Sequence, residues 1–457
     1  MAETPKNSET SKRTKSWWSK NWFYEFLEDH FFWILIGIAG IGMVLAFTVP
    51  LWVCSFSKED SVSTLRQAIL ASTGGTLAIF TLLETHQKNI REKEKNEQDH
   101  IRQVHAERRS RYAKAIEQLA DEKAPIRLGG VYTLAKLVDE WLADEKPLPS
   151  EKEGRQGRQE GQIIIDSLCA YIRSSFPLAE RYDELTLSYE EYQQNRQGNQ
   201  DLHSPQVIPL PKPKNAKQSR EEFVRDKSLF QEEQEVRKTI LSEIKNRLNG
   251  GNGGKVKRED GKHEIKPGTW SYFKYNFSNA VFFYPVDLKI ANFSREIEFR
   301  YAKFIDTADF YFTTFFVAIF AGVEFSHDAK FSHAVFKEYT DFSSTTFIGN
   351  TLFKHSKYLA KPQFTYKSSG VYTTARFAEG SKNNFSFINN GIETKRHFSR
   401  NGVVTIIPKG CVVFDPITQK TIQHYPLFDN ENTIIPEIKE KLQMSDWPKK
   451  QNWHISV

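Results

Sequence analysis

The sequence predicts an α plus β-solenoid fold class, with a hairpin of two apolar helices, a small α-helical domain and then a four-faced β-solenoid. Three observations support this class: two apolar segments near the N-terminus, helical periodicity after them, and a ladder of phenylalanines five or six residues apart. A period of five fits neither a helix, at 3.6 residues, nor a plain strand, at two. A short fixed period is typical of a solenoid, in which each unit packs on its neighbours.

The first apolar segment, residues 31–53, carries no charged side chain. At 1.5 Å per residue, its length spans the hydrocarbon core of a bilayer. Trp33 and Trp52 stand near its ends, as interfacial aromatic residues do. A cleaved signal peptide is the alternative, but a long polar and amphipathic tail, 1–30, precedes the segment and no small-residue cleavage site follows. We therefore expect a retained transmembrane helix.

The second apolar segment, residues 68–84, is of marginal length for a membrane span. A buried helix of a soluble protein is the alternative. Its small residues would allow close packing on the first helix, so the two segments are expected to form a transmembrane hairpin. The residues expected at this contact are Ala71, Gly75 and Ala78 on the second segment and Gly40, Gly42 and Ala46 on the first.

Positive charges outside the two segments predict their orientation. The connecting loop has only Lys58 and Arg66, whereas both outer flanks are rich in Lys and Arg. Because cytoplasmic flanks carry the excess of positive charge, both termini are expected in the cytoplasm. The flanking residues are Lys6, Lys12, Arg13, Lys15 and Lys20 on one side, and Lys88, Arg91, Lys93, Lys95, Arg102, Arg108, Arg109 and Arg111 on the other.

Helical segments follow the apolar pair. Residues 85–110 are highly charged and contain neither Pro nor Gly, which predicts a helical stalk, solvated or touching anionic lipid. Residues 111–179 show amphipathic helical spacing, which indicates a helical domain with Pro125 in the first turn of one helix. The pair Gly129 and Gly130 indicates close helix packing, because no phosphate-loop pattern surrounds it.

Two breaks in composition divide the rest of the helical half. Residues 180–228 are polar and contain prolines, so they are interpreted as an insertion or linker. Residues 229–248 predict a helix that packs back on the helical domain. Residues 249–268 begin with Asn-Gly-Gly-Asn-Gly-Gly and are interpreted as a flexible linker and the clearest domain boundary.

The phenylalanine ladder occupies the predicted solenoid, residues 269–366. Grouping the rungs by fours gives vertical ladders, so each coil is expected to have four faces with the large rungs inside. Adjacent coils should then lie about 4.8 Å apart. A small or β-branched residue stands two positions before nearly every rung. The ladders are Leu288, Phe310, Phe331 and Phe353; Phe293, Phe315, Phe336 and Tyr358; Phe277, Phe299, Phe320, Phe342 and Phe364; and Phe282, Phe304, Phe325 and Phe347.

This unit resembles the repeat of the pentapeptide-repeat family, which has a central Phe or Leu and a small residue two positions earlier. The resemblance implies a right-handed quadrilateral β-helix; a Phe-rich strand-and-turn domain of another type is the alternative. The chain departs from the family in its six-residue steps and in lacking the frequent Asn or Asp before the central residue. Residues 111–119 followed by 126–134 are similar to a segment of bacterial pentapeptide-repeat membrane proteins, found between a transmembrane pair and the repeats. The resemblance therefore implies a bacterial membrane-anchored protein of the plasma (inner) membrane.

Beyond the ladder, residues 367–457 are expected to continue and cap the solenoid, because an open end exposes unpaired backbone groups. Alternation over 403–422 predicts a short hairpin, and 436–443 a short helix.

The sequence offers no convincing catalytic set, so we expect no enzyme, no cofactor and no metal. Cys54, Cys169 and Cys411 are far apart, which suits a reducing compartment. His333 and His355 stand at equivalent outward positions, but no carboxylate or cysteine accompanies them. Between residues 270 and 364, ten Lys or Arg and nine Asp or Glu leave a charge of only +1. Neither DNA mimicry nor nucleic-acid binding is therefore expected.

These observations predict a non-enzymatic, multi-pass membrane scaffold that displays its solenoid to an unidentified protein partner. A rigid solenoid loses little entropy on binding. Two alternatives remain: a sensor or defence component that signals through the transmembrane pair, and an enzyme whose site forms only in three dimensions. Self-association through the apolar helices or the solenoid is left open. The outward residues expected to contact a partner are Tyr311, His333, Lys337 and Tyr339.

Overall fold

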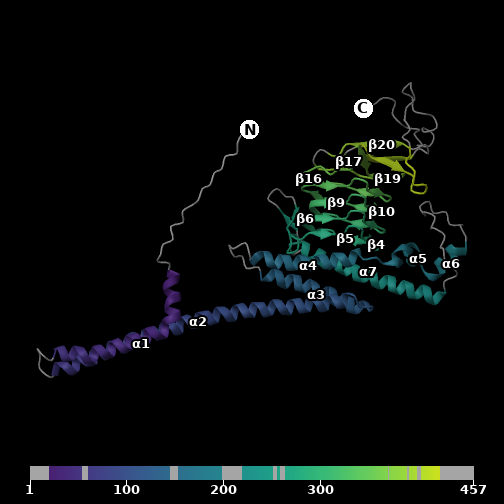
Figure 1. The fold of residues 1–457 in the computed structure, drawn as a ribbon. Coiled ribbons are helices and arrows are strands. Elements are labelled where there is room, and N and C mark those ends of the chain that lie inside the picture. The colour runs from purple at the N-terminus through teal and green to yellow at the C-terminus, as the bar shows by residue number, and fades with distance from the viewer. Residues whose placement is uncertain are drawn as a thin grey trace, which may run out of the picture. The chain divides into compact units, whose positions relative to one another are not determined.

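The computed structural model describes residues 20–53, 60–144, 153–197, 219–250, 255–257, 263–368, 370–388, 391–398 and 403–422 (Figure 1). The chain divides into two compact units, Met1–Glu107 and Arg108–Val457. Helices come first and a β-solenoid of about four turns follows, as the sequence predicts. Most of the predicted N-terminal tail, much of the 180–228 insertion and the predicted helix over 436–443 lie outside the described residues.

The first unit contains helix α1 (Lys20–Val53) and most of helix α2 (Asp60–Leu119). The two helices approach each other closely at Gly42, where an added Cβ would collide with the side chain of Thr73. The predicted contact is correct for Gly42 but not for Gly75, where an added Cβ would meet no atom within 4 Å. The opposite stripe of α2, with Thr73 and Leu77, is the half-buried one. Bulkier side chains therefore fill this contact, and the small-residue stripe faces outward.

Only one described helix is long and apolar enough to cross a membrane by length and composition, and it is the segment Ser63–Leu119 of α2. Among the residues whose side chains are described, the apolar stretch Trp33–Val49 of α1 is too short to meet the same test, which needs at least 18 residues. The sequence had indicated the opposite, with residues 31–53 long enough to span a membrane and residues 68–84 of marginal length. The charged residues predicted as a stalk, 85–110, are helical and continue α2 without a break.

The second unit begins with the last turns of α2, which pack on α3 (Ala124–Ala143) and α4 (Glu153–Arg173). Pro125 lies in the first turn of α3, as predicted. Gly130 makes the expected close helix contact, because an added Cβ would lie 2.8 Å from the carbonyl oxygen of Ala115. Gly129 has no such neighbour. Only one glycine of the pair is therefore required by packing.

Ion pairs hold the end of α2 on α3. Arg111 donates to both carboxylate oxygens of Glu140, and Arg108 pairs with Asp144 while its guanidinium lies 5.0 Å from the ring centre of Trp141. The hydrogen bond from Arg111, with the nearby positive charges of Arg108, lowers the pKa of the Glu140 carboxyl. These contacts fix the point at which α2 enters the second unit.

The pH dependence of stability should report this carboxylate. Because the folded-state pKa of Glu140 lies below its ordinary value of 4.5, its contribution is complete above pH 4.5 and is lost as the pH falls through the lowered pKa. We expect Glu140→Gln to flatten the acid limb of the unfolding free energy measured in urea from pH 6 to pH 3. Glu117→Gln on the exposed face of α2 is the control. An unchanged acid limb in Glu140→Gln would contradict the prediction.

Part of the region predicted as a linker, 180–228, is helical. It contains the end of a 3₁₀ helix (Pro177–Arg181), α5 (Tyr182–Leu185), α6 (Tyr189–Gln197) and the start of α7 (Arg220–Leu248). Ser219 forms a capping box with Glu222, so α7 begins well before the predicted start at residue 229. Tyr192 stacks on Phe223 at 4.7 Å, which explains how so polar a segment acquires a core.

The solenoid is built from short parallel strands. Strands of successive coils pair with one another and form three sheets that run along the solenoid. One sheet has the order β22-β19-β14-β10-β7-β4, the second β15-β11-β8-β5, and the third β16-β12-β9-β6-β3 with β13 also on β9. The strands are β3 (Tyr275–Asn276), β4 (Val281–Phe282), β5 (Val286–Asp287), β6 (Asn292–Glu298), β7 (Lys303–Phe304), β8 (Ala308–Asp309), β9 (Thr314–Ile319), β10 (Glu324–Phe325), β11 (Ala329–Lys330), β12 (Val335–Phe336), β13 (Thr340–Asp341), β14 (Thr346–Phe347), β15 (Thr351–Leu352), β16 (Lys357–Tyr358), β19 (Arg376–Ala378) and β22 (Val412–Phe414).

Pairing register confirms the predicted ladders. Phe304 pairs with Phe282 below it and Phe325 above it, and Phe336 lies between Phe315 and Tyr358. Rings in a ladder stack face to face at 4.6 to 5.8 Å, and rings of adjacent ladders meet edge to face. Both arrangements suit the ring quadrupoles. All the predicted rungs are buried except Tyr358, which is half-buried.

The five- and six-residue steps correspond to different corners. Every five-residue step except that from Phe315 to Phe320 places a residue with positive φ two positions after the rung, and at most of these corners the residue that follows donates its N–H to the rung carbonyl. This geometry matches a type II turn, which favours Gly at that place. Only Gly322 satisfies the preference. At the other corners of this kind, the residues with positive φ are Asn279, Ile290, Tyr301, Phe312, His333, Ser344 and His355.

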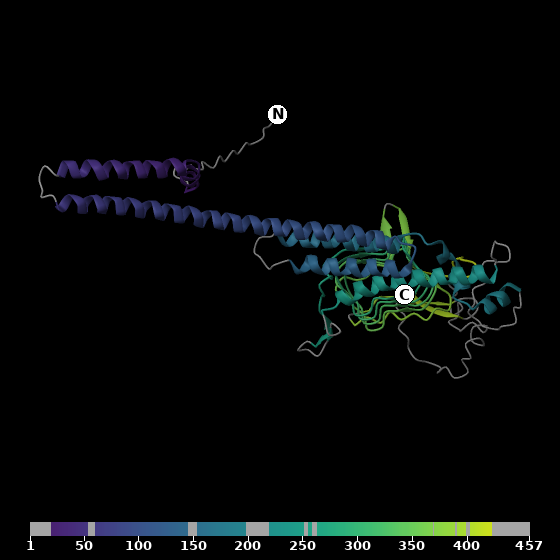
Figure 2. The same ribbon diagram turned by 90° about the horizontal axis from the view of Figure 1, so that it is seen from below.

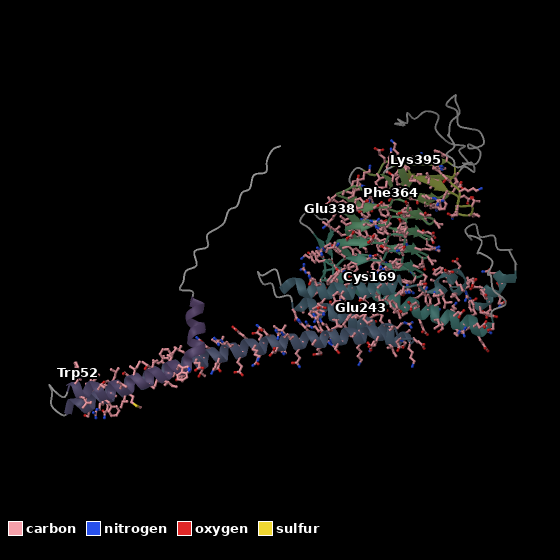
Figure 3. All side chains as sticks on the ribbon, viewed as in Figure 1. Trp52, Cys169, Glu243, Glu338, Phe364 and Lys395 are labelled. Carbon is pink, nitrogen blue, oxygen red and sulfur yellow. The ribbon has the colours of Figure 1, made fainter. Side chains whose placement is uncertain are left out.

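The helical domain closes the N-terminal end of the solenoid (Figures 1 and 2). Helices α4 and α7 pack on β3, β4 and β5, and Phe283 lies 5.2 Å from both Phe176 and Phe230. Cys169 of α4 is buried against the first coil, and burial raises the pKa of its thiol to about 12 (Figure 3). One hydrophobic core therefore runs from helices to coils.

The predicted boundary over 249–268 has a different structure. Asn249 bridges to Pro267, and the amide of Trp270 donates to the carbonyl of Arg247. The chain therefore leaves α7 at its C-terminus and comes back to the same C-terminus. Between these points lies a hairpin of β1 (Lys255–Lys257) and β2 (His263–Ile265). Trp270 also donates to Asp139, which joins the return point to α3. The glycines therefore mark an excursion within one compact unit.

The solenoid continues beyond its predicted end at residue 366. Phe377 in β19 extends one ladder above Phe347, and Val413 in β22 extends it again. Two hairpins interrupt this coil: β17 (Thr365–Ser368) with β18 (Val371–Thr374), and β20 (Thr394–Phe398) with β21 (Val404–Pro408). The predicted hairpin over 403–422 is therefore displaced toward the N-terminus, because its second half joins the coil.

Candidate functional site

An aromatic and imidazole column lies on one corner of the solenoid. His333 stacks on Phe312 at 4.7 Å with an interplanar angle of 2°, and His355 follows at 5.1 Å. Tyr311 meets His333 edge to face at 5.4 Å. Because Phe312, His333 and His355 occupy equivalent left-handed positions of successive coils, the turn itself directs their side chains outward into register. The sequence predicted this neighbourhood of the two histidines.

The imidazole of His333 in this column is biased toward the neutral form. Burial, followed by the charges of His355 and Lys354, lowers the pKa of His333. Two imidazoles can ligate a transition metal, but a protein site commonly needs three or four ligands. Within the described part of the chain, no group of three or more His, Cys, Asp and Glu side chains could hold a metal ion.

Lys337 and Tyr339 lie elsewhere, on the outer face of the sheet that contains β9 and β12. Register places Lys337 directly above Phe316 and Tyr339 above Val317. The Tyr339 hydroxyl donates to Asp341 at 3.1 Å, and burial together with that carboxylate raises the pKa of Tyr339 to about 12. The four predicted contact residues therefore fall into two groups, Tyr311 with His333 and Lys337 with Tyr339.

Exposed apolar residues around Lys337 and Tyr339 were not predicted. Phe316 is 41% exposed, Leu359 is 67% exposed and Tyr366 is 47% exposed. The signal was present in the sequence, because Phe316 directly follows a rung and must point outward in a strand. We name Phe316, Lys337, Tyr339 and Leu359 the outer face.

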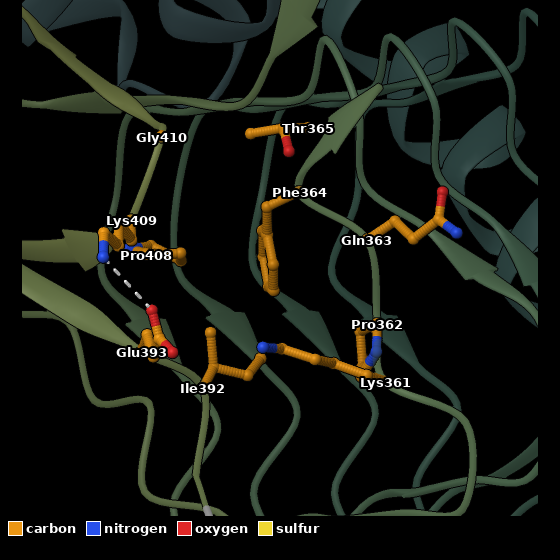
Figure 4. A pocket seen from close by; sticks show the side chains of 10 residues that line it. All are labelled: Lys361, Pro362, Gln363, Phe364, Thr365, Ile392, Glu393, Pro408, Lys409 and Gly410. Atoms are coloured by element: carbon orange, nitrogen blue, oxygen red, sulfur yellow. Dashed lines mark ion pairs between the residues drawn. The ribbon is translucent and has the colours of Figure 1, made fainter. Parts of the chain in front are cut away.

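A pocket of about 470 Å³ opens at the C-terminal end of the solenoid (Figure 4). Phe364 stands at its centre, and the buried side chains of Ile392 and Pro408 form another wall. Lys361 extends across the front of the pocket toward Ile392. The remaining lining residues are Pro362, Gln363, Thr365, Glu393, Lys409 and Gly410.

Interruptions of the last coil create this pocket. The first hairpin leaves the coil after Phe364, and the second returns to it at Gly410, whose φ of +90° suits only glycine. Gly410 approaches closely, because an added Cβ would lie 3.1 Å from both Thr365 Cγ2 and the Tyr372 hydroxyl. The amide of Lys409 donates to the carbonyl of Glu393, which fixes the wall between the hairpin strands. No single motif in the sequence marks this site.

The fold defines a repeat protein of the β-solenoid class. Compared with family models, with curated proteins and with solved structures, the chain matches none of them. The assignment of function therefore rests on the filled core, the exposed outer face and the pocket.

Proposed function

We propose that this chain is a membrane-anchored scaffold of the pentapeptide-repeat type, which binds a protein partner on its solenoid and performs no catalysis. The observation that carries the proposal is the rigid solenoid with an aromatic core and exposed aromatic residues outside. A preordered surface loses little conformational entropy on binding, and exposed Tyr and Phe supply contact area. The repeat pattern supports the family, and the apolar segments of α1 and α2 support the anchor.

The scaffold proposal is tested by cross-linking in intact cells followed by purification of the full chain. Truncation after residue 254 is unsuitable, because it would expose the helical surface that closes the solenoid. The comparison is a surface variant in which Tyr311, Phe316, Tyr339 and Leu359 are all Ala. A partner captured with the native chain and lost with this variant supports the proposal. Turnover of a small molecule by the purified chain, or a partner set that the variant leaves unchanged, contradicts it.

Membrane attachment should depend on the apolar part of α2. We expect Leu70→Arg with Leu77→Arg to move the chain from the carbonate-resistant membrane fraction into the soluble or aggregated fraction, because each charge at a helix centre costs about 3 kcal/mol on insertion scales. Ile90→Arg with Ile101→Arg, in the charged part of the same helix, is the matched control and should stay in the membrane fraction. Equal extraction of both variants would contradict an anchor in this segment.

A further inference from the structure

The pocket and the outer face form one continuous surface. Asp341 pairs with Gln363 in parallel register, and the same register carried back two residues places Lys361 directly above Tyr339. Leu359 lies above Lys337 in the same way, because Phe336 pairs with Tyr358. The pocket at the end of the solenoid therefore opens onto the exposed apolar side chains of the coils below.

This surface combines a confined apolar site with an open apolar track. Phe364 and Ile392, which line the pocket, are only 5% and 8% exposed. One inserted side chain would therefore contact apolar side chains that have little access to water. Its volume is in the range of pockets that hold small groups. Phe316 and Tyr339 extend the apolar surface over the middle coils. A buried anchor surrounded by weaker contacts is typical of binding hot spots.

The charges that line the pocket are mainly positive, because Lys361 and Lys409 are opposed there only by Glu393. On the outer face, Lys337 is offset by Glu338 and by Asp341, which accepts the hydrogen bond from Tyr339. Lys361 has no ion pair among the described residues. Lys409 and Glu393 are 3.5 Å apart, but both are about 70% exposed, so their attraction is weak and either can change partner. The complementary ligand is therefore apolar at one point and acidic beside it.

We propose that the pocket and the outer face together bind an acidic linear peptide segment of the partner, with one apolar side chain of the peptide seated against Phe364. Carboxylates flanking that anchor contact Lys361 and Lys409, and the rest of the segment lies over Tyr339 toward Phe316. This inference rests on the proposed scaffold function and deepens it by naming the partner's chemistry. It differs from the docking of a folded domain on the aromatic and imidazole column, which would leave the pocket empty.

The inference is tested by selecting phage-displayed random twelve-residue peptides on the purified full chain. We expect the enriched sequences to share a Leu or aromatic residue flanked by Asp or Glu. Synthetic peptides of that sequence, labelled for fluorescence polarisation, should lose at least about tenfold in affinity when the anchor is Ala, and lose affinity as salt rises.

Charge reversals on the protein locate the site without disturbing its core. Lys361→Glu and Lys409→Glu alter exposed side chains and should each weaken the peptide about tenfold or more. Lys330→Glu, on β11 in a different sheet, is the matched control and should bind as the native chain does. Circular dichroism of each variant checks that it is folded.

Three outcomes would overturn the inference: no enriched peptide, an enriched sequence without acidic residues, or equal binding by Lys361→Glu and the native chain. None of these would remove the scaffold proposal, because a folded partner captured by cross-linking could still depend on the other exposed residues. Loss of that cross-linked partner in the four-residue surface variant, with no peptide enriched, would keep the scaffold and reject the peptide site.

Discussion

Replacing Phe320 by alanine should lower the unfolding free energy of the second unit by about 3–5 kcal/mol. Phe320 is fully buried in the middle of its ladder, stacked on Phe299 at 5.2 Å and on Phe342 at 4.8 Å, and it meets Phe310 and Phe331 edge to face. Its removal leaves a cavity that the stacked coils above and below cannot close, because backbone pairing fixes their spacing. Urea unfolding of the full chain, followed by tyrosine and tryptophan fluorescence, measures the loss.

The matched control is Phe316→Ala, in the strand that directly precedes Phe320. Phe316 is 41% exposed, so the same change removes little buried area and should cost less than about 1 kcal/mol. The pair of variants separates burial from the general effect of losing a phenylalanine ring, because Phe316 lies in β9 and Phe320 directly follows that strand. Equal destabilisation by the two changes would contradict a core built on the ladder.

Glu233→Gln is the second change with a large expected effect. Glu233 is buried in α7 and accepts hydrogen bonds from Arg237 at 2.7 Å and from the hydroxyl of Tyr171 at 2.9 Å, while Arg127 lies 3.5 Å away. Removing its charge leaves the guanidinium of Arg237, only 1% exposed, without a compensating carboxylate. Breaking a buried ion pair from one side costs about 3–5 kcal/mol.

The expected result is a corresponding fall in the urea midpoint without a change in slope. Glu235→Gln, on the exposed side of the same helix, should change stability by less than about 0.5 kcal/mol. Replacing Glu233 and Arg237 together by Met should recover part of the loss, since that buried ion pair is then removed as a whole. If the single change at Glu233 proves as mild as the control, the network does not hold α7 in place.

The ladder could be predicted because its physical cause is local and repeated. Each rung must be large to fill the coil, and the residue two positions earlier must be small because it closes the corner turn, so both requirements recur in the sequence. Phe377 with Ala375 repeats the same signal, and the continuation of the solenoid could have been found from it. The intervening hairpins concealed it by breaking the period.

The errors in the helical region have a different cause. Tyr182, Tyr189 and Tyr192 lie in a segment whose average composition is polar, and composition conceals a few aromatic side chains that pack. The glycine-rich run after residue 249 correctly indicates a break in secondary structure. It does not reveal whether the chain returns, because that depends on contacts such as Trp270 with Asp139, which are more than a hundred residues apart.

The sequence by itself determined the β-solenoid, its four ladders and the side chains that fill them, since periodic burial leaves a periodic pattern. Only the tertiary structure decided that α4 and α7 close the solenoid and that Lys361 lies over Tyr339. Only it decided that residues from 361 to 410 form one pocket. Each of these features depends on segments that are distant in the chain and meet once, so no repeated residue pattern records them.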